Sequence, residues 1–232
     1  MTVTYETAKK QLLEAALTHV PFDGWSEATF QEAIRDTGID KTVARAVCPR
    51  GAVDLAVAFH MQGDEKMLER IAETDMSGMK FRDKVATAVR LRLEIIEDKE
   101  AVRRGATLFT LPLYAADGAK LIWGTSNKIW TALGDTSTDY NWYTKRATLS
   151  GVYSSTVLYW LGDNSPDHAA TWEFLDRRIG DVMQIEKVKA KARQNPVLSK
   201  LLAVPERVLG QIRPPSPVAP DTMPGRWINP RK

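Results

Sequence analysis

Apolar residues recur at intervals of three and four along this chain of 232 residues. Alternation of apolar and polar residues, the pattern of a half-buried β-strand, never persists beyond a few positions. The first spacing places side chains on one face of an α-helix, whereas a strand requires the second. We therefore expect an all-α protein, and the chain is long enough for a small helical domain joined to a larger one.

Capping and helix-breaking residues divide residues 1–50 into three short helices. Pro21 is expected to end the first helix, while Ser26 and Asp40 are expected to cap the second and third. Gly38 stands in a tight turn between the second and third helices, which gives a helix-turn-helix pattern. Because any cluster of three helices can produce this pattern, it predicts an N-terminal subdomain rather than a function.

The following helices form a larger and more apolar unit over residues 51–193. Several are apolar on more than one face, as helices lining a cavity would be, although core helices share this pattern. Pro112 must kink or end the sixth helix, and Ser165 with Pro166 is expected to start the ninth. Residues 194–232 then form a basic amphipathic segment and a proline-rich tail that we expect to be disordered.

Charge is distributed unevenly along the chain. Residues 1–186 carry 22 Lys and Arg against 27 Asp and Glu, whereas residues 187–232 carry 10 against 2. Such a basic segment binds nucleic acid or an anionic membrane surface, and charge alone does not choose between them. The start lacks the pattern of a signal or transit segment, and no window approaches the roughly 20 apolar residues of a spanning helix. We expect a soluble or peripheral protein, and the single cysteine suits a reducing compartment.

Recognisable catalytic and metal-binding patterns are missing from the sequence. His19, His60 and His168 fall on different helices and lack the spacing of metal ligands. There is no glycine-rich phosphate loop, nucleophile elbow or paired-carboxylate signature. Asp135 and Asp139 stand beside a turn, where we interpret them as helix caps. The sequence therefore predicts no enzymatic activity, no catalytic residue, no metal and no cofactor.

The helix-turn-helix pattern raises the alternative of a ligand-responsive transcriptional regulator. Phosphate contacts supply most of the affinity of a DNA-binding protein, so its reading surface must be basic. Residues 1–60 instead carry 6 Lys and Arg against 8 Asp and Glu. The candidate recognition helix, residues 40–47, offers two cations and few polar side chains. We expect no nucleic-acid partner and keep the regulator as the alternative function.

The most informative segment is residues 135–146, Asp-Thr-Ser-Thr-Asp-Tyr-Asn-Trp-Tyr-Thr-Lys-Arg. Trp142 and Tyr143 point about 100° apart on a helix, so at least one ring must be exposed or half exposed. Arg146 lies one turn further on, beside both rings. Aromatic rings next to an arginine are typical of the centre of a protein–protein interface. The same rings could also close the junction between the seventh and eighth helices.

This segment belongs to a longer motif, Gly-Asp-x-Ser-Thr-Asp-[Phe/Tyr]-Asn-Trp-Tyr-Thr-[Lys/Arg]-Arg. Further elements follow it, namely Asp163-x-Ser165-Pro166 and Thr171-Trp172-x-Phe174-Leu175-x-x-Arg178. Together they closely resemble the lipid-binding Coq accessory family of ubiquinone biosynthesis, the ninth in the Coq series. The resemblance spans about residues 8–186 and is densest over 134–178. It implies a TetR-like fold with an N-terminal helix-turn-helix-type bundle, and without a transit segment we expect a bacterial member.

The resemblance also implies a function. A member of this family is expected to bind an isoprenoid quinone precursor or a phospholipid in a hydrophobic cavity, and to present the precursor to a ring hydroxylase without catalysing a reaction. The expected cavity residues are Val89, Leu93, Ile96, Leu108, Leu111, Ile122, Tyr153 and Trp172. The expected hydroxylase-binding residues are Asn127, Ile129, Asp139, Trp142, Tyr143 and Arg146, and Asn127 stands where relatives have an acidic residue.

Membrane contact and assembly are further expectations from the family. Its members are expected to form homodimers and to touch the membrane with a last amphipathic helix, which places this protein on the inner face of the cytoplasmic membrane. In this chain Pro205 interrupts that segment. The expected membrane-contact residues are Leu198, Lys200, Leu201, Leu202 and Arg207.

Overall fold

The computed structural model describes residues 4–194, and this part of the chain contains α-helices, one short 3₁₀-helix and no β-strand. The all-α prediction is confirmed. In chain order the α-helices are α1 (Tyr5–Asp23), α2 (Glu27–Thr37), α3 (Lys41–Val47), α4 (Ala52–Glu73), α5 (Phe81–Glu94), α6 (Lys99–Thr110), α7 (Ala115–Ala132), α8 (Asn141–Gly162) and α9 (Ala169–Gln194), with the 3₁₀-helix η1 (Pro166–His168) before α9. None of the helices in the described range is long and apolar enough to cross a lipid bilayer.

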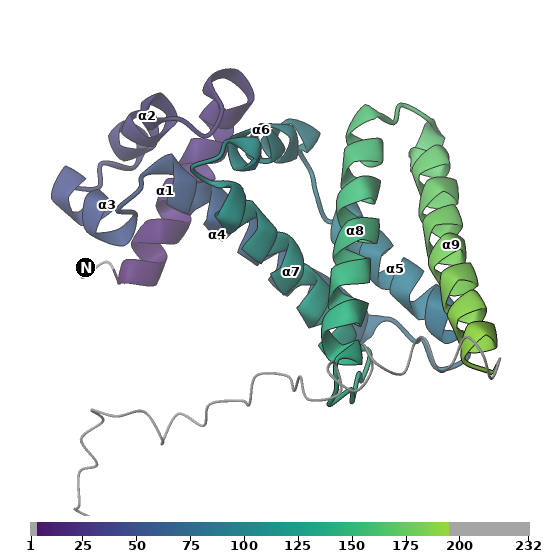
Figure 1. Cartoon of the computed structure of the whole chain (residues 1–232). Coiled ribbons are helices and arrows are strands. Elements are labelled where there is room, and N and C mark those ends of the chain that lie inside the picture. Colours follow the sequence, from purple (N-terminus) through teal and green to yellow (C-terminus); the bar gives the residue numbers. More distant parts are fainter. Residues whose placement is uncertain (1–3, 195–232) are drawn as a thin grey trace, which may run out of the picture.

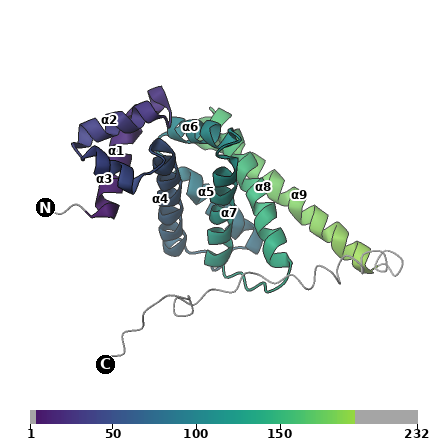
Figure 2. The same ribbon diagram turned by 60° about the vertical axis from the view of Figure 1, so that its left-hand side comes forward.

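The helices form two packed groups joined by α4, α6 and α7. Helices α1, α2 and α3 cluster at one end of the molecule, and the hairpin of α8 and α9 lies at the other (Figure 1). Helices α4 and α7 pack against each other between these ends, and α6 contacts both α1 and α7 (Figure 2). Helix α5 packs between α4, α7 and α9.

Helices α2 and α3 begin where the sequence predicts, whereas α1 ends later than predicted. Ser26 caps α2 by accepting a hydrogen bond from the backbone N–H of Thr29 at 3.3 Å, and Asp40 caps α3 in the same way. Gly38 adopts a φ of 64° in the turn, a conformation that favours glycine. The prediction that Pro21 ends α1 is wrong, because the helix continues to Asp23.

Two apolar cores stabilise the fold. The N-terminal core contains α1, α2, α3 and the first turns of α4, and Ala101 of α6 joins it, so it extends past residue 50. The larger core is built by the second half of α4 together with α5, α7, α8 and α9. Fully buried Phe30 and Leu55 belong to the first, and Met67 and Leu175 to the second.

In the second half of the chain, the helix ends and starts marked by proline and serine lie close to the predicted positions. Helix α6 ends two residues before Pro112. The Ser165 hydroxyl accepts a hydrogen bond from the backbone N–H of Ala170 at 3.0 Å. Pro166, however, starts η1 and not α9, because Asp167 and His168 have φ values of 51° and 56° and interrupt the helix. The ninth helix therefore begins three residues later than predicted.

Candidate functional site

A cavity of about 600 Å³ lies where the two helical groups meet. Its walls come from α4, α6, α7, α8 and the end of α5, and Leu17 and Trp25 close it on the side of α1. The larger apolar side chains in the wall are Phe59, Ile95, Ile96, Val102, Phe109, Leu121, Ile122, Val157 and Leu158. A cavity of this size with mostly apolar walls fits a small apolar molecule.

Close helix packing and one tryptophan shape the cavity. A Cβ atom at Gly118 would stand 2.7 Å from the Cβ of Phe109, so α6 and α7 approach this closely only because residue 118 is glycine. Trp25 lies in the wall, and its Nε1 donates a hydrogen bond to the carbonyl of Ala101 at 3.1 Å. This bond fixes the loop between α1 and α2 against α6.

Part of the predicted cavity set lies in these walls. Ile96, Ile122 and Tyr153 line the cavity. Val89 and Leu93 do not; both are buried in the larger core, where α5 meets its neighbours. The three-and-four spacing identifies the apolar side of α5, but it does not show which apolar residues face another helix and which face open space.

The three other predicted cavity residues also lie away from the walls. Leu108 packs against the N-terminal core, and Leu111 is 49% exposed in the loop that follows α6. Trp172 is half buried on α9, where its Nε1 donates a hydrogen bond to the carbonyl of Asp167 at 2.8 Å. A position next to Pro112 exposes Leu111, because the helix has already ended there.

One wall of the cavity is polar, and the sequence reasoning missed it. Asp64 of α4 is buried and accepts hydrogen bonds from Arg92 Nε at 2.8 Å and from the Thr125 hydroxyl at 2.9 Å. Arg92 is also buried, and its Nη2 donates to the carbonyl of His60 at 3.1 Å. His60 Nε2 lies 2.8 Å from the Thr125 hydroxyl. His60, Arg92 and Tyr153 all line the cavity.

Burial sets the protonation of this polar wall. It lowers the pKa of His60 to about 4, and the nearby charge of Arg92 lowers it further against the opposing effect of Asp64. His60 is therefore neutral at physiological pH. Burial also raises the pKa of Tyr153, which keeps the phenol protonated. Burial acts to lower the pKa of Arg92, but the charge and hydrogen bond of Asp64 raise it, so the guanidinium stays charged.

The loop before α8 folds onto α7 around a buried arginine. Arg146 is 2% exposed. Its Nη1 donates to the Asp135 carboxylate and to the Trp142 carbonyl, each at 2.9 Å, and its Nε donates to Asn127 Oδ1 at 2.6 Å. Lys145 Nζ binds the other Asp135 oxygen at 2.8 Å. Asp135 is therefore the partner of two cations, and its interpretation as a simple helix cap is wrong.

The protonation of Asp135 follows from these contacts. Burial acts to raise the pKa of this carboxyl. Hydrogen bonds from Lys145, Ser137 and Arg146 act in the opposite direction and prevail, so the pKa falls to about 2. The carboxylate is consequently charged at every physiological pH and binds both cations.

The residues predicted to bind a hydroxylase occupy different depths. Ile129 and Arg146 are buried, so they support this region from inside and are not exposed to a partner. Trp142 and Tyr143 are both half buried, and their ring centroids lie 4.8 Å apart. Asp139 is exposed and accepts a hydrogen bond from the backbone N–H of Asn141 at 3.0 Å, as a capping residue does.

Trp123 of α7 adds a third ring that the sequence reasoning did not select. Its centroid lies 6.0 Å from that of Trp142 and 6.3 Å from that of Tyr143. All three rings are half buried. We call Trp123, Trp142 and Tyr143 the aromatic patch. Trp123 precedes Asn127 by four residues on α7, so helical spacing from a selected residue could have identified it.

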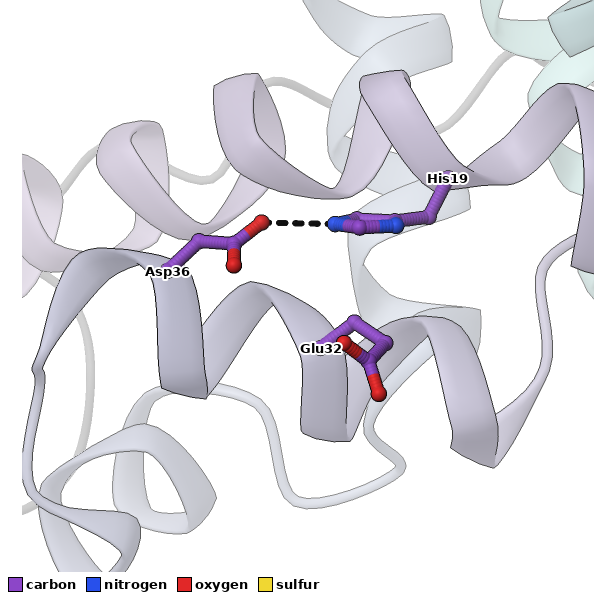
Figure 3. A group of neighbouring side chains, drawn as sticks. All are labelled: His19, Glu32 and Asp36. Atoms are coloured by element: carbon purple, nitrogen blue, oxygen red, sulfur yellow. Dashed lines mark hydrogen bonds and ion pairs between the residues drawn. The ribbon is translucent and has the colours of Figure 1, made fainter.

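His19, Glu32 and Asp36 come together between α1 and α2, although the sequence shows no metal-ligand spacing (Figure 3). His19 Nε2 lies 2.6 Å from Asp36 Oδ2, and Glu32 pairs with Arg35 on its own helix. These partners account for the three side chains as an ordinary hydrogen bond and an ordinary ion pair near the surface.

Cys48 lies in the N-terminal core. Cys48 is buried, and burial raises the pKa of its thiol to about 11, so it is not a nucleophile at neutral pH. Leu198, Lys200, Leu201, Leu202 and Arg207 lie outside the described residues.

Comparison with known sequences finds a matching family model and similar curated proteins. Residues 115–186 match the family model COQ9. The chain contains a COQ9 domain. Rat "Ubiquinone biosynthesis protein COQ9, mitochondrial" is 32% identical over 191 residues, which cover 78% of this chain and 60% of the rat protein. The human protein of the same name is 30% identical over 191 residues, covering 78% and 59%.

The COQ9 homology extends well beyond the matched domain. A Dictyostelium discoideum protein named as a probable ubiquinone biosynthesis protein coq9 is 28% identical over 190 residues, which cover 78% of this chain and 61% of that protein. The chain spans about three fifths of the length of these curated relatives. The COQ9 domain itself includes α7, α8, the aromatic patch and one side of the cavity.

Structural comparison establishes the fold of this COQ9 homologue. A TetR transcriptional regulator from Nitrosomonas europaea superposes with a TM-score of 0.61, covering 74% of this chain and 95% of that chain. The two sequences are 14% identical, so the likeness concerns the fold alone. The TetR-like prediction is confirmed.

Proposed function

We propose that this COQ9 homologue is a non-enzymatic accessory protein of ubiquinone biosynthesis. In this proposal it binds an isoprenoid quinone precursor in the cavity and presents it to a ring hydroxylase of the pathway. The observation that carries the proposal is the mostly apolar cavity of about 600 Å³ in a chain whose relatives are named ubiquinone biosynthesis proteins.

The physical need for such a protein comes from the precursor itself. Moving an isoprenoid tail from a membrane into water costs about 0.8 kcal/mol of free energy for each CH₂ group. A cavity lined by residues such as Phe59, Ile122 and Val157 replaces that water with apolar contacts. The aromatic patch lies on α7 and α8, which also supply walls of the cavity. Its half-buried rings are of the kind that protein interfaces use as anchors.

Assembly as a homodimer belongs to the proposal. Leu158 and Tyr159 on α8 and Met183 on α9 are exposed apolar side chains on two helices that pack together. Burying such a face against a second copy removes apolar surface from water. Since Leu158 also lines the cavity, a second copy at this face would cover part of the cavity wall.

The alternative function, a DNA-binding regulator, rests on the TetR-like fold. The second helix of its helix-turn-helix, α3, offers little for DNA. Arg45 is held by an ion pair with Glu27 and lies over the Phe30 ring, 4.7 Å from its centroid. Lys41 is then the remaining cation of α3, beside exposed Val43. Phosphate contacts dominate DNA affinity, so we favour the accessory role.

Extraction of bound lipid tests the proposed function. The full chain is purified without detergent, extracted with chloroform and methanol, and analysed by mass spectrometry. We expect an isoprenoid or phospholipid species at a fixed ratio to protein. Ala106→Trp places a large side chain in the cavity wall and should lower this ratio, whereas Ala46→Trp adds the same side chain on exposed α3 and should not.

Two results would contradict the proposed lipid-binding function. If folded wild-type protein yields no lipid, or if both tryptophan variants retain the wild-type ratio, the cavity does not hold the ligand. Metal or cofactor absorbance in the pure protein, with turnover of a quinone precursor, would instead establish an enzyme.

A further inference from the structure

Tyr153 presents a hydroxyl to the cavity that the described part of the protein does not use. The side chain is 4% exposed and lines the cavity, yet its hydroxyl makes no hydrogen bond to any side chain of residues 4–184 or to the described backbone. Among the described side chains, only Arg104 Nε is both sealed from solvent and without a hydrogen bond, so the Tyr153 oxygen is not sealed. The Tyr153 oxygen therefore reaches open space. Because buried polar groups are rarely left without a partner, a ligand atom fits here.

Arg92 lines the same cavity as Tyr153 and is held in a fixed orientation. Its Nε binds Asp64 at 2.8 Å and its Nη2 binds the His60 carbonyl at 3.1 Å. The guanidinium lies against Gly63, where an added Cβ would stand 2.8 Å from Cζ. Arg92 and Tyr153 both belong to the lining of the cavity. A donor fixed in this way is ready to bind a ligand oxygen.

The charges around Arg92 balance without a ligand. Asp64 compensates Arg92 at 2.8 Å, and Lys128 Nζ lies 3.6 Å from Asp64 and 3.8 Å from Glu65. His60 is neutral because burial lowers its pKa to about 4. An anionic head would add an uncompensated charge to a buried site, which is unfavourable. A neutral oxygen adds none.

We propose that Tyr153 and Arg92 form a polar subsite that binds a neutral oxygen on the head of the ligand, while its chain lies along the apolar walls. The shared chemistry is a hydrogen-bonding oxygen without charge. A phenol or quinone oxygen on an aromatic ring provides it, and so does the ester carbonyl of a glycerolipid. The subsite presupposes the proposed function, because it selects among ligands that the cavity already holds.

Four probes test the subsite on the full chain, by displacement of a bound naphthalene dye. Three carry the same tail: 2-geranylgeranylphenol, geranylgeranylbenzene and geranylgeranyl phosphate. The fourth is dioleoylglycerol. Wild-type protein should bind the phenol about tenfold more tightly than the benzene, as one added hydrogen bond allows. Tyr153→Phe should lose most of this preference and keep its affinity for the benzene. Tyr159→Phe, on the same helix but outside the cavity wall, should keep the preference.

Each outcome separates the subsite from the function on which it rests. Equal binding of phenol and benzene by wild type overturns the subsite and leaves the lipid-binding function standing. Tightest binding of the phosphate also overturns it, because the site then selects charge. If no probe displaces the dye, the lipid-binding function fails, and the subsite with it. Loss of dioleoylglycerol binding in Tyr153→Phe supports a glycerolipid source, and its retention supports a ring oxygen.

Discussion

The guanidinium of Arg146 lies 3.9 Å from the centre of the Trp142 ring and binds the buried Asp135 carboxylate at 2.9 Å. One side chain therefore connects the first turns of α8 to the loop that precedes it. Because Arg146 is almost fully buried, its charge is compensated inside the protein. Its guanidinium helps to hold the Trp142 ring in place. The half-buried ring is then the part of this pair that a partner can reach.

Arg146→Ala should strongly destabilise the fold. The substitution leaves Asp135 buried without its buried cation, and breaking such a pair costs about 3–5 kcal/mol. Lys145→Ala is the matched control, because Lys145 binds the same carboxylate from a position that is 38% exposed. We expect the control to lose about 1 kcal/mol or less. Urea unfolding at pH 7 measures both free energies of unfolding, and equal losses would contradict the buried role of Arg146.

Trp142→Lys should leave the fold intact and weaken binding of the ring hydroxylase. A central aromatic anchor typically contributes 2 kcal/mol or more, about a thirtyfold loss of affinity. Pull-down of the full chain with the hydroxylase measures it. Phe22→Lys is the control, because Phe22 is 80% exposed on α1, far along the chain from the aromatic patch. An unfolded Trp142→Lys protein, or binding as tight as wild type, would show that Trp142 is not the anchor.

Much of the fold could be predicted because its signals are local. Ser26 and Asp40 cap helices through contacts within three residues, and Gly38 marks a turn by its own conformational freedom. Pro21 failed as a signal, since α1 runs two residues beyond it to Asp23. Such signals act within one or two turns of a helix.

The candidate site could be predicted only in part, because its contacts are distant in sequence. Asp64 and Arg92 are 28 residues apart, and Thr125 is 61 residues from Asp64. Each of these looks like an ordinary surface residue until the helices pack. One signal was present: Asp64 falls in line with Met67 and Ile71 on the buried face of α4, and a charge on an apolar face requires a buried partner.

His60 should make stability depend on pH below neutrality. Its pKa is lowered from 6.5 to about 4, so between these values the unfolded chain takes up a proton that the folded protein refuses. The free energy of unfolding therefore falls as pH falls through this window, by up to about 3 kcal/mol. His60→Gln cannot titrate and should lack this part of the fall. Urea unfolding of both proteins between pH 7 and pH 4 measures the difference, and parallel curves would contradict the prediction.

The basic C-terminal segment should attach the protein to anionic membranes. Residues 187–213 carry seven Lys and Arg against Glu206, interleaved with apolar residues. Each cation near an anionic surface contributes about 1 kcal/mol. Deleting residues 194–232 should therefore reduce co-sedimentation with phosphatidylglycerol vesicles, and added salt should reduce that of the full chain. Phosphatidylcholine vesicles are the control. Salt-insensitive binding that the deletion leaves unchanged would exclude this segment.

Gly63→Ala should destabilise the protein because Arg92 occupies the space of the added methyl group. A Cβ at residue 63 would stand 2.8 Å from the Cζ of Arg92 and from both terminal nitrogens. The arginine can move away only by weakening its bonds to Asp64 and to the His60 carbonyl. We expect a loss of about 1–3 kcal/mol in the free energy of unfolding.

Gly151→Ala is the matched control for this substitution. Gly151 also lies inside a helix, but its added Cβ meets no other atom within 4 Å. Alanine loses less backbone freedom on folding than glycine, so this variant should gain about 0.5–1 kcal/mol. Opposite signs for the two changes in urea unfolding would locate the effect at Arg92. If Gly63→Ala gained as much stability as Gly151→Ala, the guanidinium of Arg92 would be free to move away from Gly63. The claim that Arg92 has a fixed orientation in the cavity wall would then be wrong.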